Sequence, residues 1–413
     1  MCWSAHERPA SDRVVITGLG VFSSIGIGVE DFTTGLREGR SGVSPISVFD
    51  TDGFAHANGC EVRDFKPEEW LERWSVDNLG RTSQFAVAAA RMAVRDAGLT
   101  DAGLHDRRVQ VSIGTTDGES QDLDHLAERW VESGPESWDP DVTRRVGAGR
   151  LSAAVAWELG LRNAEALTLA TACSAGNYAI GMGFDAIRVG DADIALCGGA
   201  DTMCRKSFTA IYRLGTIAPD FCRPFDKDRQ GILNGEGAGV LVLERLDHAL
   251  ARGARIYAEV LGYGLSCDAY HPVQPEQSSI ARCMRSALAD AGVRPEDVDL
   301  ISAHGTGTKT NDVTESRAIR EVFEEPPRTV SLKSMLGHTM GAASSLGAIA
   351  CSLAITNGFI PPTINHRETD PECEIDCVPN ESVTADLRVV QNNGLAFAGN
   401  NAVVVLGRHQ PRA

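Results

Sequence analysis

The chain has 413 residues, of which 43% are hydrophobic and 23% are charged, so it holds enough apolar material for a sizeable core. This composition excludes a disordered chain and a collagen-like repeat. A formal charge of −17, from 39 Lys and Arg against 56 Asp and Glu, argues against a partner such as nucleic acid or an anionic membrane. A prior of about 150 residues per domain predicts two or three domains, or one large α/β unit.

The cysteines and the N-terminus indicate the compartment. Eleven cysteines are scattered without a repeating spacing, which is typical of reduced thiols in a cytoplasmic protein. Residues 1–12 include Trp3, His6 and Glu7 where a signal peptide would need an apolar run, so we expect a mobile tail and no export. No stretch approaches about 18 apolar residues, so we expect no membrane span.

The first elements in chain order alternate strand and helix. The β-branched residues after position 13 predict a buried strand that runs into a glycine turn at Gly18 and Gly20. An alanine-rich periodicity predicts a helix over residues 83–97, and a strand follows over 109–114. The polar stretch 117–150 has weak strand character, which indicates an insertion that is helical in part.

The rest of the chain repeats this pattern. A strand, a turn of small residues at Cys173 and an apolar helix to Gly190 precede the strands 193–200 and 240–244. From residue 255 the alternation restarts, with strands at 256–261, 298–303 and 329–332, helices at 278–291, 314–323 and 341–356, and a strand pair within 394–406. We expect an internal duplication, with halves at residues 13–254 and 255–413. A single irregular α/β domain stays open as the alternative.

Cys173 is the candidate nucleophile. It lies in Thr-Ala-Cys-Ser-Ala-Gly (171–176), where small neighbours permit a tight bend and place the thiol at a helix N-terminus. Unpaired N–H groups and the helix dipole favour a thiolate there. Most cysteines are buried structural residues, and that interpretation of Cys173 stays open at this point.

Two histidines are expected to share its site. His304 follows a hydrophobic strand in Ala-His-Gly-Thr-Gly-Thr (303–308), and His338 follows Lys333-Ser-Met-Leu-Gly before a helix of small residues. Each could instead be a core residue, but three such groups at strand-to-helix turns indicate one shared site. Glu315 is expected to open a helix and Lys333 to end a strand, with surface ion pairing as the alternative for both.

Three other sequence patterns bear on nucleotide or metal sites, and none of them indicates one. The glycines from Gly18 to Gly26 only superficially match a dinucleotide fingerprint, and a structural turn is the better interpretation. No P-loop is present, and Cys373 and Cys377 lack the second close pair that a zinc site needs. These motifs therefore give no reason to expect NAD, a P-loop nucleotide or a zinc ion.

Four motifs follow one another along the chain: those around Cys173, around His304 and from Lys333 to His338, and Ala396-Phe-Ala-Gly-Asn-Asn. Together they resemble the β-ketoacyl-acyl-carrier-protein synthases of the elongating Cys-His-His class, and the resemblance runs from about residue 13 to residue 407. It implies the thiolase-like α/β fold, in which two duplicated βαβαβαββ halves form α-β-α-β-α layers, and an acyltransferase that performs decarboxylative Claisen condensation without cofactor or metal.

The resemblance also implies roles for individual residues. Cys173 would accept the acyl group, and His304 and His338 would serve the malonyl group. Lys333 and Glu315 would be supporting charges. Phe397 would be the gating phenylalanine, and its backbone N–H would form an oxyanion hole with that of Cys173.

Two departures from the family pattern bear on the acyl substrate. Ala396 and Ala398 replace flexible glycines, which restricts positive φ in the gating loop. Thr115, Thr116 and Asp117 replace a more apolar segment near the acyl pocket. These changes leave chain length and polarity open, and they favour polyketide or other specialised acyl chains over housekeeping fatty acid synthesis.

The implied partners are an acyl carrier protein bearing acyl and malonyl thioesters and a second subunit, either a copy of this chain or a chain-length-factor-like protein. Because carrier proteins are acidic, we expect docking on the local basic pairs Arg205-Lys206 and Arg144-Arg145, with solvated charge as the alternative. A ketosynthase active only with a chain-length factor, and a non-catalytic acyl-binding scaffold, remain alternative functions. A thiolase is disfavoured because no cysteine follows Cys377.

Overall fold

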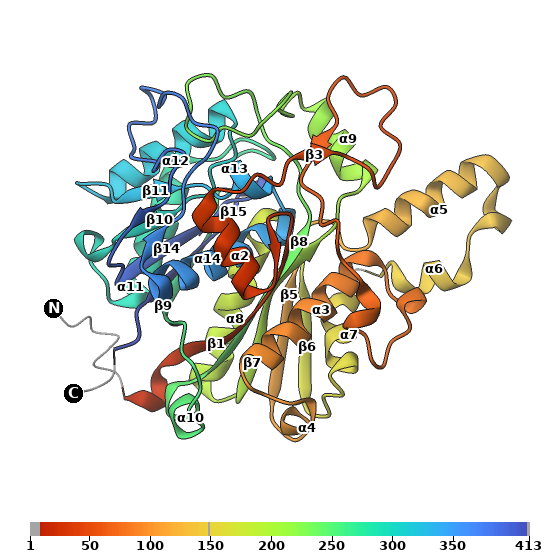
Figure 1. Ribbon diagram of the computed structural model, residues 1–413, viewed down its shortest axis with the longest axis horizontal. Coiled ribbons are helices and arrows are strands. Elements are labelled where there is room, and N and C mark those ends of the chain that lie inside the picture. Colours follow the sequence, from red (N-terminus) through yellow and green to blue (C-terminus); the bar gives the residue numbers. More distant parts are fainter. Residues whose placement is uncertain (1–8, 148, 411–413) are drawn as a thin grey trace.

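Strands and helices alternate along the chain in the computed structural model, which describes residues 9–147 and 149–410 (Figure 1). Its strands are β1 (Val14–Ser23), β2 (Gly26–Ile27), β3 (Ser44–Pro45), β4 (Asn58–Gly59), β5 (Val109–Gly114), β6 (Ala164–Leu169), β7 (Ile194–Asp201), β8 (Gly237–Arg245), β9 (Ala258–Cys267), β10 (Leu300–Ser302), β11 (Arg328–Val330), β12 (Phe359–Ile360), β13 (Val383–Thr384), β14 (Val389–Gly394) and β15 (Asn400–Gly407). Its α-helices are α2 (Val29–Glu38), α3 (Arg81–Asp96), α4 (Asp101–Leu104), α5 (Ser120–Ser133), α6 (Pro140–Arg145), α7 (Arg150–Glu158), α8 (Ala175–Val189), α9 (Arg205–Arg213), α10 (Leu246–Ala251), α11 (Gln277–Ala291), α12 (Lys309–Val322), α13 (Lys333–Leu336) and α14 (Ala343–Asn357).

Eleven of the described strands form one mixed sheet in the order β11-β10-β14-β15-β9-β1-β8-β7-β5-β6, with β2 beside β1. Counted within its own half, each set of five has the order third, second, fourth, fifth, first. The sense of pairing also agrees, because β6-β5-β7 and β11-β10-β14 are parallel while β7-β8-β1 and β14-β15-β9 are antiparallel. This repeated topology confirms the predicted fold class of two duplicated α/β halves.

The two halves join along their first strands. β1 pairs antiparallel with β9 over only three residues, Val14–Ile16 against Ala258–Val260. The register of β1 against β8 shifts directly after Ile16. The sheet therefore continues through hydrogen bonds from one half into the other.

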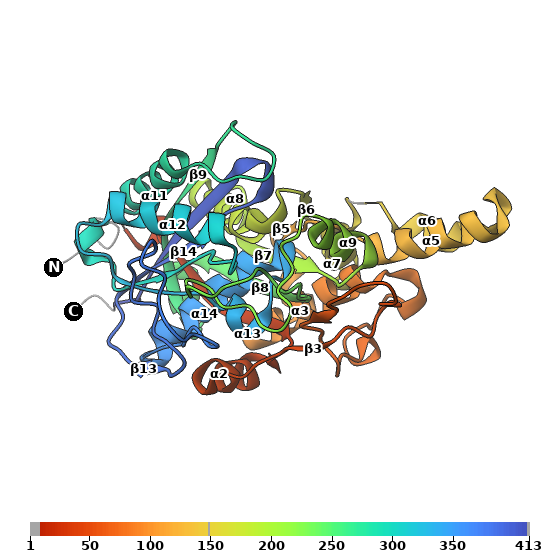
Figure 2. The same cartoon turned by 90° about the horizontal axis from the view of Figure 1, so that it is seen from above.

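Helices form three layers around this sheet, as Figures 1 and 2 show. α3 and α7 cover the outer face of the N-terminal half, and α11 and α12 cover the outer face of the other half. α8 and α14 contact each other and strands of both halves, so they form the central layer. The predicted α-β-α-β-α arrangement is thus observed, and the first turns of α8 and α14 meet at the centre of the molecule.

The central helix α14 is also the most apolar one. Met340–Asn357 is long and apolar enough to cross a membrane by composition, with a mean hydropathy of 1.3, but 83% of it is buried in the protein. Among the described residues it is the only helix that passes this test. Its burial between the two halves identifies it as a core helix.

Several predicted boundaries are corrected. Gly18 and Gly20 lie inside β1 and not in a turn, because α3 packs so closely that a Cβ on Gly18 would lie 2.2 Å from the Ala93 carbonyl oxygen. Ala10–Asp12, predicted as part of the tail, forms a 3-10 turn, η1; residues 1–8 lie outside the described residues. The strand before Lys333 ends at Val330, so Lys333 begins α13.

The insertion at residues 117–150 contains α5 and α6, which extend from the body as an arm (Figure 2). The Trp130 and Trp138 rings meet edge to face at 5.3 Å. Trp130 and Val131 are 50% and 86% exposed. The arm therefore contributes little to the core and presents apolar side chains on its surface.

Candidate active site

Cys173 lies in a sharp turn between β6 and α8. The turn is the 3-10 segment η5 (Ala172–Ser174), and Ala172 adopts a left-handed φ of 53°. Small side chains on either side allow this bend. The Cys173 side chain is only 8% exposed and sits beside the first turn of α8.

The corresponding turn of the other half has the same shape. The 3-10 segment η7 (Met340–Ala342) precedes α14, and Met340 has a φ of 49° where Ala172 has 53°. Both helices that follow have 15 residues and end at a left-handed glycine, Gly190 and Gly358. Gly341 occupies the position that corresponds to Cys173, so the duplication provides two equivalent turns and a thiol in only one of them.

His304 stands between β10 and α12, and its backbone is fixed by Glu315. The Glu315 carboxylate accepts hydrogen bonds from the amides of His304 and Gly305, each at 2.8 Å, and from Asn393 Nδ2 at 3.0 Å. Glu315 is fully buried within α12, which begins at Lys309, so it does not open the helix as predicted. It acts on the backbone of the histidine loop.

His338 is fixed by the segment before β8. Its amide donates to the Leu233 carbonyl at 2.7 Å, and its carbonyl accepts from the Gly235 amide at 2.9 Å. Its ring atom Nδ1 accepts the Met340 amide proton at 3.0 Å. Because Nδ1 accepts a hydrogen bond, it carries no hydrogen, and the proton of the neutral ring is on Nε2.

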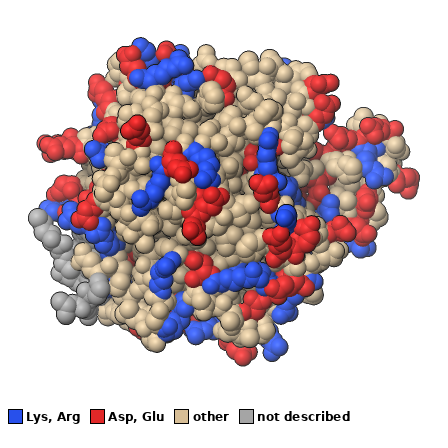
Figure 3. Space-filling model, in the orientation of Figure 1, with Lys and Arg blue, Asp and Glu red and all other residues tan. Residues whose placement is uncertain are grey.

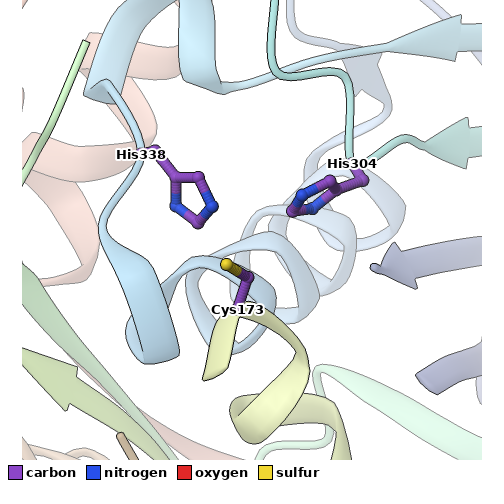
Figure 4. Close-up of side chains that lie close together, drawn as sticks. All are labelled: Cys173, His304 and His338. Carbon is purple, nitrogen blue, oxygen red and sulfur yellow. The ribbon is translucent and has the colours of Figure 1, made fainter. Parts of the chain in front are cut away.

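These three side chains meet in one buried cluster. The Cys173 Sγ and one ring nitrogen of each histidine lie within 4.8 Å of one another. The two imidazole rings are 5.3 Å apart between centroids and inclined by 82°. Figure 4 shows the sulfur directed towards the space between the rings. The predicted shared site is therefore present in the fold.

Lys333 contacts His304 through both its backbone carbonyl and its ring. Its Nζ donates to the His304 carbonyl oxygen at 2.5 Å and is 3.4 Å from the ring atom Nδ1. Burial lowers the Lys333 pKa, and the electrostatic influence of Cys173 and then Glu315 opposes that shift only in part. Burial first, and then the Lys333 charge, hold the pKa values of His304 and His338 well below their usual range. Both imidazoles are therefore neutral at physiological pH.

The thiol is protonated in the free protein. Burial raises the pKa of Cys173 to about 12, although the Lys333 charge and the backbone amides of Cys173 and Phe397 lower it. These groups thus act in the direction predicted for a helix N-terminus, but desolvation exceeds their effect on the Cys173 pKa. The two amides named here are the donors expected for the oxyanion hole, and both lie beside the sulfur.

Phe397 begins a short 3-10 turn, η8 (Phe397–Gly399), and its side chain is 44% exposed. Ala398 has a φ of 62°, a left-handed conformation that suits glycine better. Its amide donates to the Pro272 carbonyl at 2.8 Å. Ala396 is extended, with a φ of −140°, so only one of the two replaced glycines meets the expected restriction.

Thr115, Thr116 and Asp117 gather around a carboxylate that the sequence analysis missed. Asp201 accepts from the Thr115 hydroxyl at 2.6 Å and from the amides of Thr116 and Asp117 at 2.7 and 3.0 Å. It also accepts from the Gly341 amide at 2.6 Å. Burial, and then the Asp117 charge, raise its pKa to about 7. Its place at the end of β7, after two glycines, was the available signal.

The four basic side chains predicted to dock a carrier protein all have acidic neighbours. Arg144 is 75% exposed, whereas Arg145 is 20% exposed and makes two hydrogen bonds at 2.8 Å to one carboxylate. Figure 3 shows positive and negative side chains interspersed over the face in view. The ion pairs are Arg205–Glu128, Lys206–Asp117, Arg144–Asp141 and Arg145–Asp122.

Comparison with protein families gives two matches. Residues 11–249 match the model described as "Beta-ketoacyl synthase, N-terminal domain" and residues 257–367 match "Beta-ketoacyl synthase, C-terminal domain". A 3-oxoacyl-[acyl-carrier-protein] synthase 2 of Synechocystis sp. is 38% identical, over 96% of this chain and 98% of its own. Nodulation protein E of Rhizobium sp. is 40% identical, over 95% and 98%.

Solved structures give the same result. A chain of "The ishigamide ketosynthase/chain length factor" is 62% identical, with a TM-score of 0.96 over 97% of this chain and all of that one. A chain from a type II PKS acyl-carrier protein in complex with its ketosynthase bound to the hexaketide is 32% identical, with a TM-score of 0.88 over 97% and 100%.

Proposed function

This chain belongs to the β-ketoacyl synthase family, a family of acyltransferases, and we propose that it joins a Cys173-bound acyl group to a malonyl unit on an acyl carrier protein. The observation that carries this proposal is the buried meeting of one thiol with two neutral imidazoles. A thiol can hold an acyl group as a thioester, and two N–H donors can hold an enolate oxygen.

The first step transfers the acyl group. The Cys173 sulfur attacks the carbonyl carbon of the acyl-carrier thioester, the bond to the carrier sulfur breaks, and the thiol proton ends on the departing carrier thiol. The tetrahedral oxyanion is stabilised by the amides of Cys173 and Phe397, the two donors beside the sulfur. One well-placed donor of this kind contributes about 2.7–4 kcal/mol in the transition state.

The second step makes the carbon–carbon bond. Malonyl-carrier protein loses its carboxylate as CO2, and the bonding electrons form an enolate. Its oxygen accepts from Nε2–H of His338 and of His304, because their Nδ1 atoms face the Met340 amide and the Lys333 ammonium. The enolate carbon attacks the acyl carbon on Cys173, the C–S bond breaks, and the leaving Cys173 thiolate takes up a proton from water, which restores the thiol. Burial of the cluster protects the carbanion from water.

We propose that the pathway is type II polyketide or other specialised acyl synthesis. The ketosynthase/chain-length-factor structure at 62% identity supports this, whereas the Synechocystis and Rhizobium relatives are more distant. The polar groups Thr115, Thr116 and Asp117, arranged around Asp201, also support an acyl chamber that differs from an apolar fatty acyl pocket.

We further propose a dimer, formed with a second copy or with a chain-length-factor-like subunit. β6 is the last strand of the sheet, and its first three residues are exposed while the other three are half-buried. A six-residue edge of this kind is open to pairing with another chain. The residue Glu165 is its only charge.

The ten cysteines that the described residues include are all free, which supports a cytoplasmic location.

The test is acylation of the Cys173 peptide, read by mass spectrometry after incubation with acyl- and malonyl-carrier proteins. The wild-type chain should become acylated and release CO2 and the β-ketoacyl product, and Cys173→Ala should do neither. His304→Ala and His338→Ala should keep acyl transfer better than decarboxylation.

The alternatives give different results in the same assay. Product formation only after addition of a chain-length-factor subunit would assign the chain to an obligate pair. Failure of acylation with every carrier substrate, with and without such a subunit, would identify a non-catalytic acyl-binding scaffold and overturn the proposal.

A further inference from the structure

The cluster of Cys173, His304 and His338 has the composition of a zinc site. One sulfur and two ring nitrogens lie within 4.8 Å of one another, and all three residues are buried. Structural and catalytic Zn²⁺ sites use such Cys and His sets in tetrahedral geometry. A site that keeps this thiol and both imidazoles free therefore needs a way to reject the metal.

The positions of the protons on the two histidine rings provide a way to reject the metal. An imidazole binds a metal through a lone pair, and its other nitrogen then carries the proton and donates it to an acceptor. His338 has the opposite arrangement, since its Nδ1 accepts the Met340 amide proton at 3.0 Å. Its proton is therefore on Nε2, the nitrogen that remains for the cluster.

His304 has the same arrangement by a different means. The Lys333 ammonium, which has donors and no acceptor, is 3.4 Å from Nδ1 and donates to the carbonyl of the same residue at 2.5 Å. The proton of His304 is again directed to Nε2. The buried Lys333 charge also repels a second cation entering the cluster.

We propose that the Met340 amide and Lys333 keep thiophilic divalent cations such as Zn²⁺ off the Cys173–His304–His338 cluster. The same two donors leave Nε2–H of each ring available to an oxygen atom. This inference concerns which ions the site rejects and does not depend on the proposed condensation.

The test uses the full chain and Co²⁺, because a Co²⁺–thiolate bond has a charge-transfer absorption that reports on the sulfur. Wild type, Lys333→Met and Lys66→Met are titrated, the last being the same substitution at a side chain that is 70% exposed. Groups behind metal ligands change metal affinity by about 10–100-fold. Lys333→Met should therefore bind Co²⁺ at least tenfold more tightly than wild type, and Lys66→Met should not differ from it.

Further variants show whether Co²⁺ binds at the Cys173 sulfur and whether the Lys333 charge is what excludes it. Adding Cys173→Ser to Lys333→Met should remove the absorption, and Lys333→Arg, which keeps donors and charge, should behave as wild type. Equal Co²⁺ affinity in wild type and Lys333→Met overturns the proposal, whether both bind or neither binds. If Lys333→Met does not fold, the proposal is tested by alkylation of Cys173 in the wild-type protein with iodoacetamide. Protection of Cys173 by equimolar Zn²⁺ would overturn the proposal, and an unchanged rate of alkylation supports it.

Discussion

The carboxylate of Glu315 binds the backbone of His304, with hydrogen bonds of 2.8 Å from the amides of His304 and Gly305. Glu315 is thus a positioning residue, because it sets the place of the imidazole through the chain that carries it. Asn393 completes its hydrogen bonding at 3.0 Å. The expected supporting charge is therefore a clamp on the histidine loop.

Glu315→Gln should loosen this clamp. An amide offers fewer acceptor sites, and its NH2 group would face an amide donor, so we expect the unfolding free energy to fall by about 1–3 kcal/mol. The kcat for malonyl decarboxylation should fall by about tenfold or more, with little change in KM or in Cys173 acylation. Glu372→Gln, at a side chain that is 63% exposed, is the control. Equal losses of acylation and decarboxylation would contradict a positioning role.

Ala398 and Ala396 provide a matched pair of positions in and beside η8, the turn that holds Phe397. Ala398 is left-handed, with a φ of 62°, and Ala396 is extended. A left-handed alanine costs about 1–2 kcal/mol relative to the right-handed form, which Ala398→Gly would relieve. Glycine at an ordinary position costs about 0.5–1 kcal/mol of stability. Denaturant unfolding should therefore show Ala398→Gly as stable as wild type or more stable, and Ala396→Gly less stable; the reverse order would refute the assignment.

The pH dependence of decarboxylation should reflect neutral imidazoles. Burial lowers the pKa of both histidines, so they stay neutral below the ordinary histidine value of 6.5. The rate should show no inflection near pH 6.5. Because only the unfolded state gains these protons as the pH falls through 6.5, their contribution to the unfolding free energy decreases there. An inflection near 6.5 that disappears in His338→Ala would contradict this prediction.

Charge reversal should have different effects at Arg144 and Arg145, two of the proposed docking residues. Arg144 and its partner Asp141 are 75% and 79% exposed, so Arg144→Glu should raise the KM for the carrier substrate with little loss of stability. Arg145→Glu breaks a half-buried pair with Asp122 and should lower the unfolding temperature as well. A carrier KM that is unchanged in Arg144→Glu at low salt would remove this residue from the docking surface.

The β6 edge should govern assembly. Ala166 lies in its exposed part, and a lysine on an open edge opposes pairing with another strand. Ala166→Lys should weaken the dimer at least tenfold in sedimentation equilibrium, while Ala251→Lys, at an exposed end of α10, should not. If both variants remain dimeric at the wild-type affinity, the interface lies elsewhere.

The sequence by itself determined the repeating order of strands and helices, because the periodicity of apolar residues is local. It also determined the two turns of small residues and the motifs of Cys173, His304 and His338, since each is a short run of neighbouring residues. Boundaries were less exact: Lys333 begins a helix, and Glu315 lies inside one.

Only the tertiary structure decided what those residues face. Asp201 accepts hydrogen bonds from the amides of Thr116 and Gly341, which are 85 and 140 positions away in the sequence. Lys333 lies beside His304, although 29 positions separate them in the sequence. The tertiary structure also placed acidic side chains beside the basic residues that were predicted to dock a carrier protein. Burial, which raises the pKa of Cys173 to about 12, depends on how both halves pack around α8 and α14, so no local pattern could indicate it.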